Sequence, residues 1–288
     1  MLGYLSRVLM LATADGRTLA WREAGSGPPL LMHPGGPGCS ARYFDELPEL
    51  EAHRTLLLLD PRGTGDSDRP ADPHAYDLDD YAADVEALRE HLALEQIDVL
   101  GHSHGGFVAM AWAGLYPDRV GRLVLAGTAP RFTDAIRAHR MKQSLAHQDQ
   151  PYFAAALEAF ARQQAGDYAD DAELAALYDA GARATGKPGD DTRGLRWMFE
   201  VAGVNADATR HFNERVVMDL RPRLDNITAP TLVLTGSDDA FASSVAEIAD
   251  HLADPTVVII PGADHFAFLE PANRGAWSQA ILDFLDGT

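Results

Sequence analysis

The sequence predicts an α/β fold, with a mostly parallel eight-stranded sheet, helices on both faces of the sheet and a helical cap inserted into the chain. Short apolar segments alternate with helical segments in both end regions of the chain, which is typical of βαβ units. Between about residues 130 and 230 this alternation stops, and an alanine-rich stretch with helical spacing replaces it. We therefore expect a core of residues 1–130 and 226–288, with a cap of residues 131–225 inserted after the sixth strand.

The first two expected strands form a hairpin, because the pair Asp15-Gly16 favours a tight turn between strands. The other strands are short apolar segments bounded by turn residues, and a helix is expected over Leu78–Leu92. The eight expected strands are Val8–Thr13, Thr18–Glu23, Leu30–Met32, Leu56–Leu59, Ile97–Leu100, Leu123–Ala126, Thr231–Thr235 and Thr256–Ile260.

The inserted segment is expected to consist of helices, interrupted by glycine and proline near residues 181–189. The expected helices include Tyr152–Gln164, Ala172–Ala184 and Thr192–Val201. Ligands of open α/β sheets bind beyond the carboxyl ends of the strands. A cap above those ends would exclude water and shape the substrate pocket.

A pentapeptide of the form Gly-x-Ser-x-Gly, from Gly101 to Gly105, lies between an apolar strand and a helical segment. This placement is the pattern of a nucleophile elbow, a sharp turn that presents a serine hydroxyl beyond the end of its strand. Gly101 and Gly105 must lack a Cβ so that strand and helix can cross, and Ser103 is expected in a strained backbone conformation. We therefore expect Ser103 to be a catalytic nucleophile.

An acid and a histidine follow the elbow in the chain order expected of a serine hydrolase, each just after an apolar strand. His265 is the candidate general base, which would take the Ser103 proton and return it to the leaving group. The acid that orients His265 is either Asp238 or Asp239. In the other interpretation, one of the two caps the helix that starts near Ser243 or closes an Asx turn, and both roles can be filled, one by each residue. Asp264 is expected to be a turn residue.

Acyl transfer also requires hydrogen-bond donors for the developing oxyanion. A glycine-rich turn, His33 to Gly38, follows a core strand and can bring a backbone N–H beside Ser103. The second donor would be the N–H of His104. A surface loop is the other interpretation of such a turn, but its position directly after a core strand favours the oxyanion role.

These motifs together resemble the α/β-hydrolase superfamily, and within it the proline iminopeptidase-like branch. The resemblance covers nearly the whole chain and includes a loop from Asp60 to Ser67. It implies an α/β-hydrolase fold, Gly36 as an oxyanion donor and Asp239 as the acid. The chain departs from the family pattern at Pro34, which occupies a histidine position, and at the two histidines beside the serine.

The resemblance implies a serine hydrolase, without a cofactor, that cleaves an amide bond to an N-terminal amino acid in a small peptide or an aminoacylated metabolite. The alternatives are an esterase, thioesterase or lactonase with the same three residues, or a ligand-binding receptor of the same fold. Exopeptidases of this family hold the substrate's free amine with acidic cap residues. Here Glu200 and Glu214 are candidates, with Trp197 and Phe199 beside the first. The other interpretation makes the aromatic residues cap core and the glutamates solvated helix faces.

Other polar residues are expected to have structural roles. His102 and His104 are expected to pack and to supply backbone donors, because no carboxylate or cysteine ligand set for a metal accompanies them. Asp60, Arg62 and Asp66 are expected to brace their loop through turns and an ion pair.

Composition excludes several function classes. The net charge of −19, from 24 basic and 43 acidic residues, opposes binding to nucleic acid or to an anionic membrane. Cys39 is the only cysteine, so the chain forms no intrachain disulfide. The stretch from Met1 to Leu5 imitates a secretion signal only faintly, because it lacks a charged start and an apolar centre. We expect a cytoplasmic enzyme that acts on a small substrate and binds no metal.

Overall fold

An eight-stranded sheet runs through the protein with the strand order β1-β2-β4-β3-β5-β6-β7-β8. The computed structural model describes residues 7–44, 47–214 and 218–287, so the Met1 to Leu5 stretch lies outside the described residues. Strand β2 is antiparallel to both of its neighbours, and the remaining pairs are parallel. The mostly parallel eight-stranded sheet is therefore confirmed. Its strands are β1 (Val8–Ala12), β2 (Thr18–Gly25), β3 (Pro29–His33), β4 (Thr55–Leu59), β5 (Ile97–His102), β6 (Val120–Ala126), β7 (Thr231–Gly236) and β8 (Pro255–Ile260).

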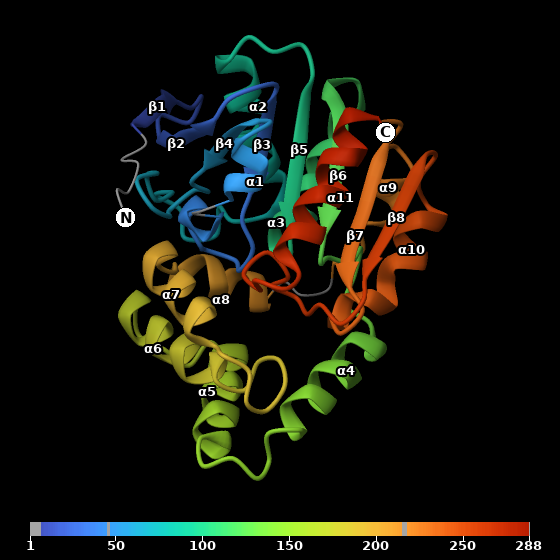
Figure 1. The fold of residues 1–288 in the computed structure, drawn as a ribbon. Helices are drawn as coiled ribbons and strands as arrows, with labels where there is room; N and C mark the ends of the chain where they lie inside the picture. The colour runs from blue at the N-terminus through green and yellow to red at the C-terminus, as the bar shows by residue number, and fades with distance from the viewer. Residues whose placement is uncertain (1–6, 45–46, 215–217, 288) are drawn as a thin grey trace.

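Helices cover both faces of the sheet because alternate side chains of each strand point to opposite faces. On β3, Leu31 belongs to the core beneath α2 (Leu78–His91), α3 (His104–Leu115) and α10 (Val245–Asp250). Its neighbour Leu30 belongs to the opposite core, beneath α1 (Pro48–Glu51) and α11 (Arg274–Asp286). Figure 1 shows α11 crossing in front of the sheet, with α3 behind it.

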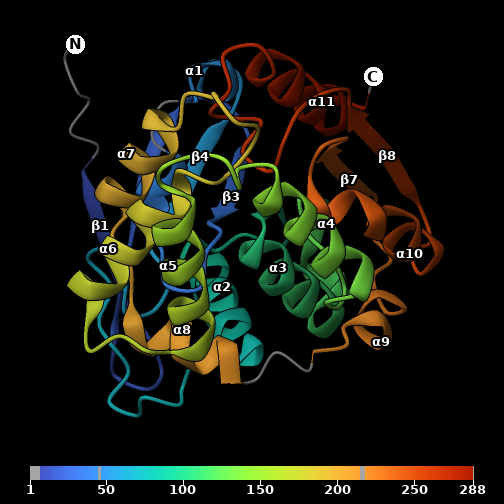
Figure 2. The same cartoon turned by 90° about the horizontal axis from the view of Figure 1, so that it is seen from below.

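A group of helices lies at one end of the sheet (Figure 1), with α4 set apart from the others. These helices are α4 (Asp134–Leu145), α5 (Phe153–Ala165), α6 (Asp171–Ala182), α7 (Arg193–Ala202) and α8 (Ala206–Glu214). The expected helices over Tyr152–Gln164, Ala172–Ala184 and Thr192–Val201 match α5, α6 and α7 to within two residues at each end. Seen from below, α4 and α5 lie across the end of the sheet (Figure 2).

The group of helices has its own small apolar core. Five buried side chains form it: Ala159, Tyr168, Leu174, Leu177 and Ala206. Short helical turns complete the chain: η1 (Ala41–Phe44), η2 (Pro117–Arg119), α9 (Arg221–Leu224) and η3 (Ala240–Ser244). None of the helices in the described ranges combines the length and apolar character needed to cross a membrane.

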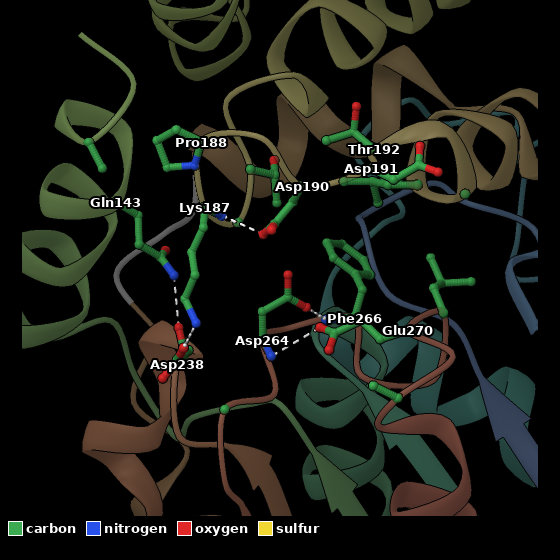
Figure 3. Close-up of a pocket in the computed structure, with 18 of the residues that line it drawn as sticks. Gln143, Lys187, Pro188, Asp190, Asp191, Thr192, Asp238, Asp264, Phe266 and Glu270 are labelled. Atoms are coloured by element: carbon green, nitrogen blue, oxygen red, sulfur yellow. Dashed lines mark hydrogen bonds and ion pairs between the residues drawn. The ribbon is translucent and has the colours of Figure 1, made fainter. Parts of the chain in front are cut away.

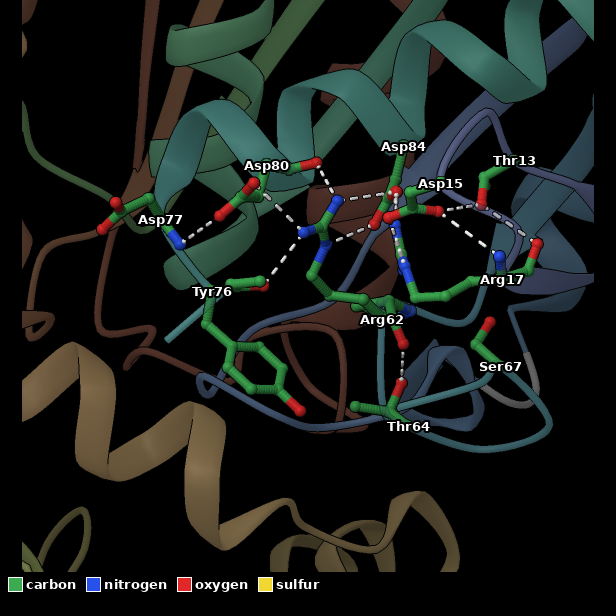
Figure 4. Close-up of polar contacts among 12 residues, drawn as sticks. Thr13, Asp15, Arg17, Arg62, Thr64, Ser67, Tyr76, Asp77, Asp80 and Asp84 are labelled. Carbon is green, nitrogen blue, oxygen red and sulfur yellow. Dashed lines mark hydrogen bonds and ion pairs between the residues drawn. The ribbon is translucent and has the colours of Figure 1, made fainter. Parts of the chain in front are cut away.

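A buried ion-pair network holds the loop from Asp60 to Ser67 against α2 (Figure 4). Arg62 donates to both carboxylate oxygens of Asp84, at 2.7 and 2.8 Å, and Arg17 donates to the same carboxylate at 2.9 Å. Asp60 and Asp66 both pair with Arg22 rather than with Arg62. The three loop residues thus bind structural partners, and Asp60 also accepts the backbone N–H of Ala41 at the start of η1, at 2.9 Å.

Candidate active site

Ser103 occupies a sharp turn between β5 and α3. Its φ of 55° and ψ of −115° are strained for a residue with a side chain. A Cβ at Gly101 would lie 2.2 Å from the carbonyl oxygen of Gly105, and a Cβ at Gly105 would lie 2.1 Å from that of His33. Both distances are far below van der Waals contact, so only glycine fits at these two positions. The elbow has the strained geometry that the pentapeptide predicts.

The glycine-rich turn after β3 packs against Ser103. A Cβ at Gly35 would lie 2.9 Å from the Cβ of Ser103. Gly36 has a φ of +56°, in the left-handed region that favours glycine, and its added Cβ would lie 2.8 Å from Cys39 Sγ. Gly36 and His104 line the same cavity as Ser103. The backbone of both expected oxyanion donors therefore lies beside the serine.

His265 forms a partly buried hydrogen bond with the buried Asp239 carboxylate, with His265 Nδ1 2.9 Å from Asp239 Oδ2. Since a carboxylate only accepts, Nδ1 is the donor in this bond, and Nε2 takes no part in the contact with Asp239. Burial alone would raise the pKa of Asp239, but the charge and hydrogen bond of His265, with the N–H of Phe241, hold this pKa below its usual value. His265 lines the Ser103 cavity, although within the described residues no hydrogen bond joins the two side chains. Such contacts often tighten only when substrate binds.

The acid beside His265 is Asp239, and Asp238 points elsewhere. The Asp238 carboxylate pairs with Lys187 Nζ at 2.7 Å, and its backbone carbonyl accepts from Gln143 at 2.8 Å (Figure 3). Asp239 also caps η3, since its Oδ1 accepts the N–H of Phe241 at 2.9 Å. The cap and the histidine contact are therefore not divided between Asp238 and Asp239, because the two oxygens of the Asp239 carboxylate make both contacts.

Three buried histidines surround the elbow without forming a metal site. Burial lowers the pKa of His102 and of His104 to about 3, and that of His33 to about 4, so all three rings are neutral near pH 7. His102 Nε2 lies 2.9 Å from the backbone oxygen of His265, and its Nδ1 lies 2.8 Å from the Tyr43 hydroxyl. In the part of the chain that the structure describes, no group of three or more His, Cys, Asp or Glu side chains could hold a metal ion.

The cavity around Ser103 has a volume of about 220 Å³ and adjoins an outer cavity of about 530 Å³, with which it shares eight residues. Aromatic side chains make up much of the inner lining, and α5 and α8 add amide side chains to it. Its described lining residues include no Asp or Glu. These residues are Gly36, Pro37, Tyr43, Ser103, His104, Phe107, Phe132, Arg140, Phe160, Gln163, Gln164, Tyr178, Phe199, Thr209, Phe212, Asn213, Phe241, His265 and Phe266.

The structure does not bring the two candidate amine-binding glutamates into this cavity. Glu200 and Trp197 are exposed and line a separate surface pocket on α6 and α7. Glu214 is exposed at the end of α8 and lines none of the cavities described here. Phe199 alone of the expected cap residues lines the Ser103 cavity, where it stacks on Tyr178 with ring centroids 4.7 Å apart.

The sequence pattern misses the charged residue that does reach this cavity, Arg140 of α4. Nothing in its local sequence sets it apart, because α4 also contains Arg137 and Lys142. Only the packing of α4 against η3 reveals that Arg140 is the one of these three cations that lines the Ser103 cavity. The same is true of Tyr178 and Phe212, whose positions depend on how the helices are arranged.

Comparisons with known proteins agree with the geometry and with the resemblance that the motifs predict. Residues 28–272 match the family described as alpha/beta hydrolase fold. A proline iminopeptidase from Lactobacillus helveticus is 28% identical over 284 residues, covering 92% of each chain. A 2-(acetamidomethylene)succinate hydrolase from Mesorhizobium japonicum is 30% identical over 284 residues, covering 93% of this chain and 92% of the relative. Among solved structures, a hydrolase from Pseudomonas aeruginosa superposes with a TM-score of 0.70 at 29% identity, covering 99% of both chains.

Proposed function

The chain belongs to the alpha/beta hydrolase fold family, and from this premise we propose that it is a serine hydrolase acting through an acyl-enzyme. The observation that carries the proposal is the 2.9 Å contact between His265 and Asp239 at the cavity that also contains Ser103. A buried carboxylate that fixes a histidine beside a strained serine is the arrangement that nucleophilic catalysis requires.

In the proposed mechanism, Nε2 of His265 takes the hydroxyl proton of Ser103 while Oγ attacks the substrate carbonyl carbon. Asp239 stabilises the resulting imidazolium, and the N–H groups of Gly36 and His104 bind the oxyanion. The intermediate collapses as the bond to the leaving group breaks, and His265 gives its proton to that group. Water then attacks the acyl-enzyme by the same steps, which releases the acid and restores Ser103.

We propose that residues 131–225 act as the cap of this site. Phe160 of α5 and Phe212 of α8 line the same cavity as Ser103 and Gly36. Aromatic side chains at these positions exclude water from the acyl-enzyme and confine the substrate to a small volume. This arrangement favours a small-molecule substrate.

We propose that the scissile bond is an amide in a small molecule. Both relatives described above carry names of enzymes that act on amide or imino-acid substrates. A second candidate is cleavage of an amide bond to an N-terminal amino acid, favoured by the relatives named proline iminopeptidase. In that case the substrate's free amine would have to bind without Glu200 or Glu214, which lie outside the cavity. Hydrolysis of esters or thioesters by the same three residues is the remaining alternative.

A substrate panel tests the proposal. Aminoacyl arylamides, the same arylamides with blocked amines, acyl arylamides and aryl esters are offered to the wild type and to Ser103→Ala. Turnover that disappears in Ser103→Ala supports the serine mechanism, and equal rates in the two proteins contradict it. A requirement for the free amine identifies the aminopeptidase candidate. Turnover of esters alone identifies the esterase alternative.

A further inference from the structure

Arg140 extends from α4 into the space around the candidate active site. It lines both the Ser103 cavity and the outer cavity next to it. Its guanidinium carbon lies 5.1 Å from the centroid of the Phe241 ring and 5.5 Å from that of Phe132. Phe241 in turn packs on His265, with ring centroids 5.4 Å apart. Two aromatic rings therefore hold this cation beside the histidine.

Arg140 has no anionic partner among the residues that the structure describes. Across residues 7–44, 47–214 and 218–287, no carboxylate lies within ion-pair distance of it, and its N–H groups make no hydrogen bond. Arg137, one turn earlier on the same helix, pairs with Asp134 at 2.9 Å. Asp239 acts on Arg140 through its charge, but its two oxygens are engaged by His265 and by the N–H of Phe241.

A partly buried cation without an anionic partner is costly, because the guanidinium loses part of its hydration without gaining an anion. Burial accordingly lowers the pKa of Arg140 below its usual value. Its five N–H donors make no hydrogen bond among the described residues, so they are free to donate to a ligand. A ligand that supplies a negatively charged acceptor would offset the cost of the lost hydration.

The rest of the cavity lining indicates whether that ligand carries a positive or a negative charge. No Asp or Glu is among the described residues that line the Ser103 cavity, and Arg140 is the one lining side chain there with a permanent charge. An ammonium group would meet a cation with no compensating carboxylate. An anion would meet the guanidinium and a set of amide and hydroxyl donors.

We infer that Arg140 binds a carboxylate of the substrate, so that the protein acts on compounds carrying a carboxylate in addition to the scissile carbonyl. The planar guanidinium fork matches a carboxylate in a two-point hydrogen bond. One cation balances one negative charge, whereas a phosphate dianion would leave a charge uncompensated among aromatic rings. The cleavage part of this inference rests on the proposed serine mechanism, and the binding part does not.

The test compares matched esters that differ in one charge. The mono-4-nitrophenyl ester of glutaric acid carries a free carboxylate, and its methyl ester replaces this carboxylate with a neutral group of similar size. We expect the wild type to prefer the charged ester by about 10- to 100-fold in kcat/KM. Arg140→Met, whose side chain can still pack between Phe132 and Phe241, should reduce the preference to near one. Arg137→Met removes a cation from the same helix and should keep the preference.

Binding is measured separately, so that failure of the enzyme and failure of the carboxylate site are distinguishable. Monomethyl glutarate is titrated by calorimetry into Ser103→Ala and into Ser103→Ala/Arg140→Met. Binding that weakens about 10-fold or more without Arg140 supports the inference, even if no ester is hydrolysed. Arg140→Lys tests geometry, because a single ammonium keeps the charge and loses the fork, and it should restore only part of the affinity.

Two results would overturn the inference. One is that the wild type hydrolyses both esters equally while Ser103→Ala is inactive, which would leave the serine mechanism standing. The other is that monomethyl glutarate binds neither Ser103→Ala nor Ser103→Ala/Arg140→Met, or binds both with the same affinity. If Arg140→Met proves unfolded by circular dichroism, the Arg140→Lys protein and the wild-type ester preference decide between these outcomes.

Discussion

His102 Nε2 donates a hydrogen bond to the backbone carbonyl of His265, across 2.9 Å. Since a carbonyl only accepts, the proton of the neutral ring is on Nε2, and Nδ1 accepts from the Tyr43 hydroxyl at 2.8 Å. Tyr43 also touches the glycine-rich turn after β3, because a Cβ at Gly35 would lie 2.5 Å from its hydroxyl. One chain of contacts therefore joins the glycine-rich turn, the elbow and the loop that carries His265.

We expect His102→Ala to lower kcat by about 10- to 100-fold while KM changes little, because the variant frees the His265 loop without touching the cavity. His102→Gln should recover part of the loss, since its side-chain amide can still donate to the His265 carbonyl. Steady-state kinetics on the best ester or amide substrate measure kcat and KM of the two variants and of the wild type. A loss of kcat that merely tracks the loss of folded protein, seen by circular dichroism, would contradict the positioning role.

The strained backbone of Ser103 predicts that substitutions at this position differ in their effect on stability. Glycine adopts a φ of 55° without steric cost, whereas alanine retains the strain of serine. Ser103→Gly should therefore be more stable than Ser103→Ala by about 1 kcal/mol, although both lack the nucleophile. Urea unfolding of the two variants tests this, and equal or reversed stabilities would show that the elbow is not strained in solution.

Asp84 balances two buried cations, Arg62 and Arg17. Removing its carboxylate leaves both guanidinium groups without their main buried partner, so Asp84→Ala should lower the free energy of unfolding by about 3–5 kcal/mol. Asp134→Ala is the matched control, because its carboxylate is fully exposed in its pair with Arg137. The control should lose less than about 1 kcal/mol. Similar losses in the two variants would contradict the structural importance of the buried network.

Much of the fold is predictable from the sequence because its signals are local. Each core strand is a short apolar segment. The turn that holds Ser103 requires residues without a Cβ at positions 101 and 105, and the sequence shows glycine at both. The order of serine, acid and histidine follows from which residues succeed the strands. The choice of Asp239 over Asp238 rests on resemblance to a family, since only the fold shows that Asp238 turns toward Lys187.

The arrangement of helices α4 to α8 is less predictable, because these helices pack through contacts far apart in the chain. An amphipathic pattern identifies α7, but it does not show which end of the helix meets the active site. The sequence therefore indicates Glu200 as a candidate amine-binding residue, although this residue lines a separate surface pocket. The sequence does not distinguish Arg140 from the other cations of α4, although Arg140 lines the Ser103 cavity.

Asp264 lies next to the candidate base and shares a hydrogen-bonded cluster with Glu270 (Figure 3), whose Oε1 accepts the Asp264 N–H at 3.1 Å. Burial, together with the Glu270 side chain, raises the pKa of Asp264 from 3.8 to about 8. Between these values the folded chain keeps a proton that the unfolded chain has released. This contribution therefore makes the free energy of unfolding fall as the pH rises through that range.

Asp264→Asn should remove this dependence, because asparagine has the shape of the protonated acid and no charge to desolvate. We expect the stability of Asp264→Asn relative to the wild type to increase from about pH 5 to about pH 9. Denaturant titrations at several pH values measure the difference. A constant difference across that range would show that Asp264 has an ordinary pKa.

Covalent labelling tests the central claim most directly, because it asks for the nucleophile without needing the substrate. A fluorophosphonate is added to the wild type, Ser103→Ala and His265→Ala, and the intact mass of each protein is measured over time. We expect one adduct on the wild type at Ser103, none on Ser103→Ala, and much slower labelling of His265→Ala, since the hydroxyl then lacks its base. Equal labelling of the wild type and Ser103→Ala would contradict the assignment of Ser103. A wild type that hydrolyses its substrate but takes up no label would contradict it as well.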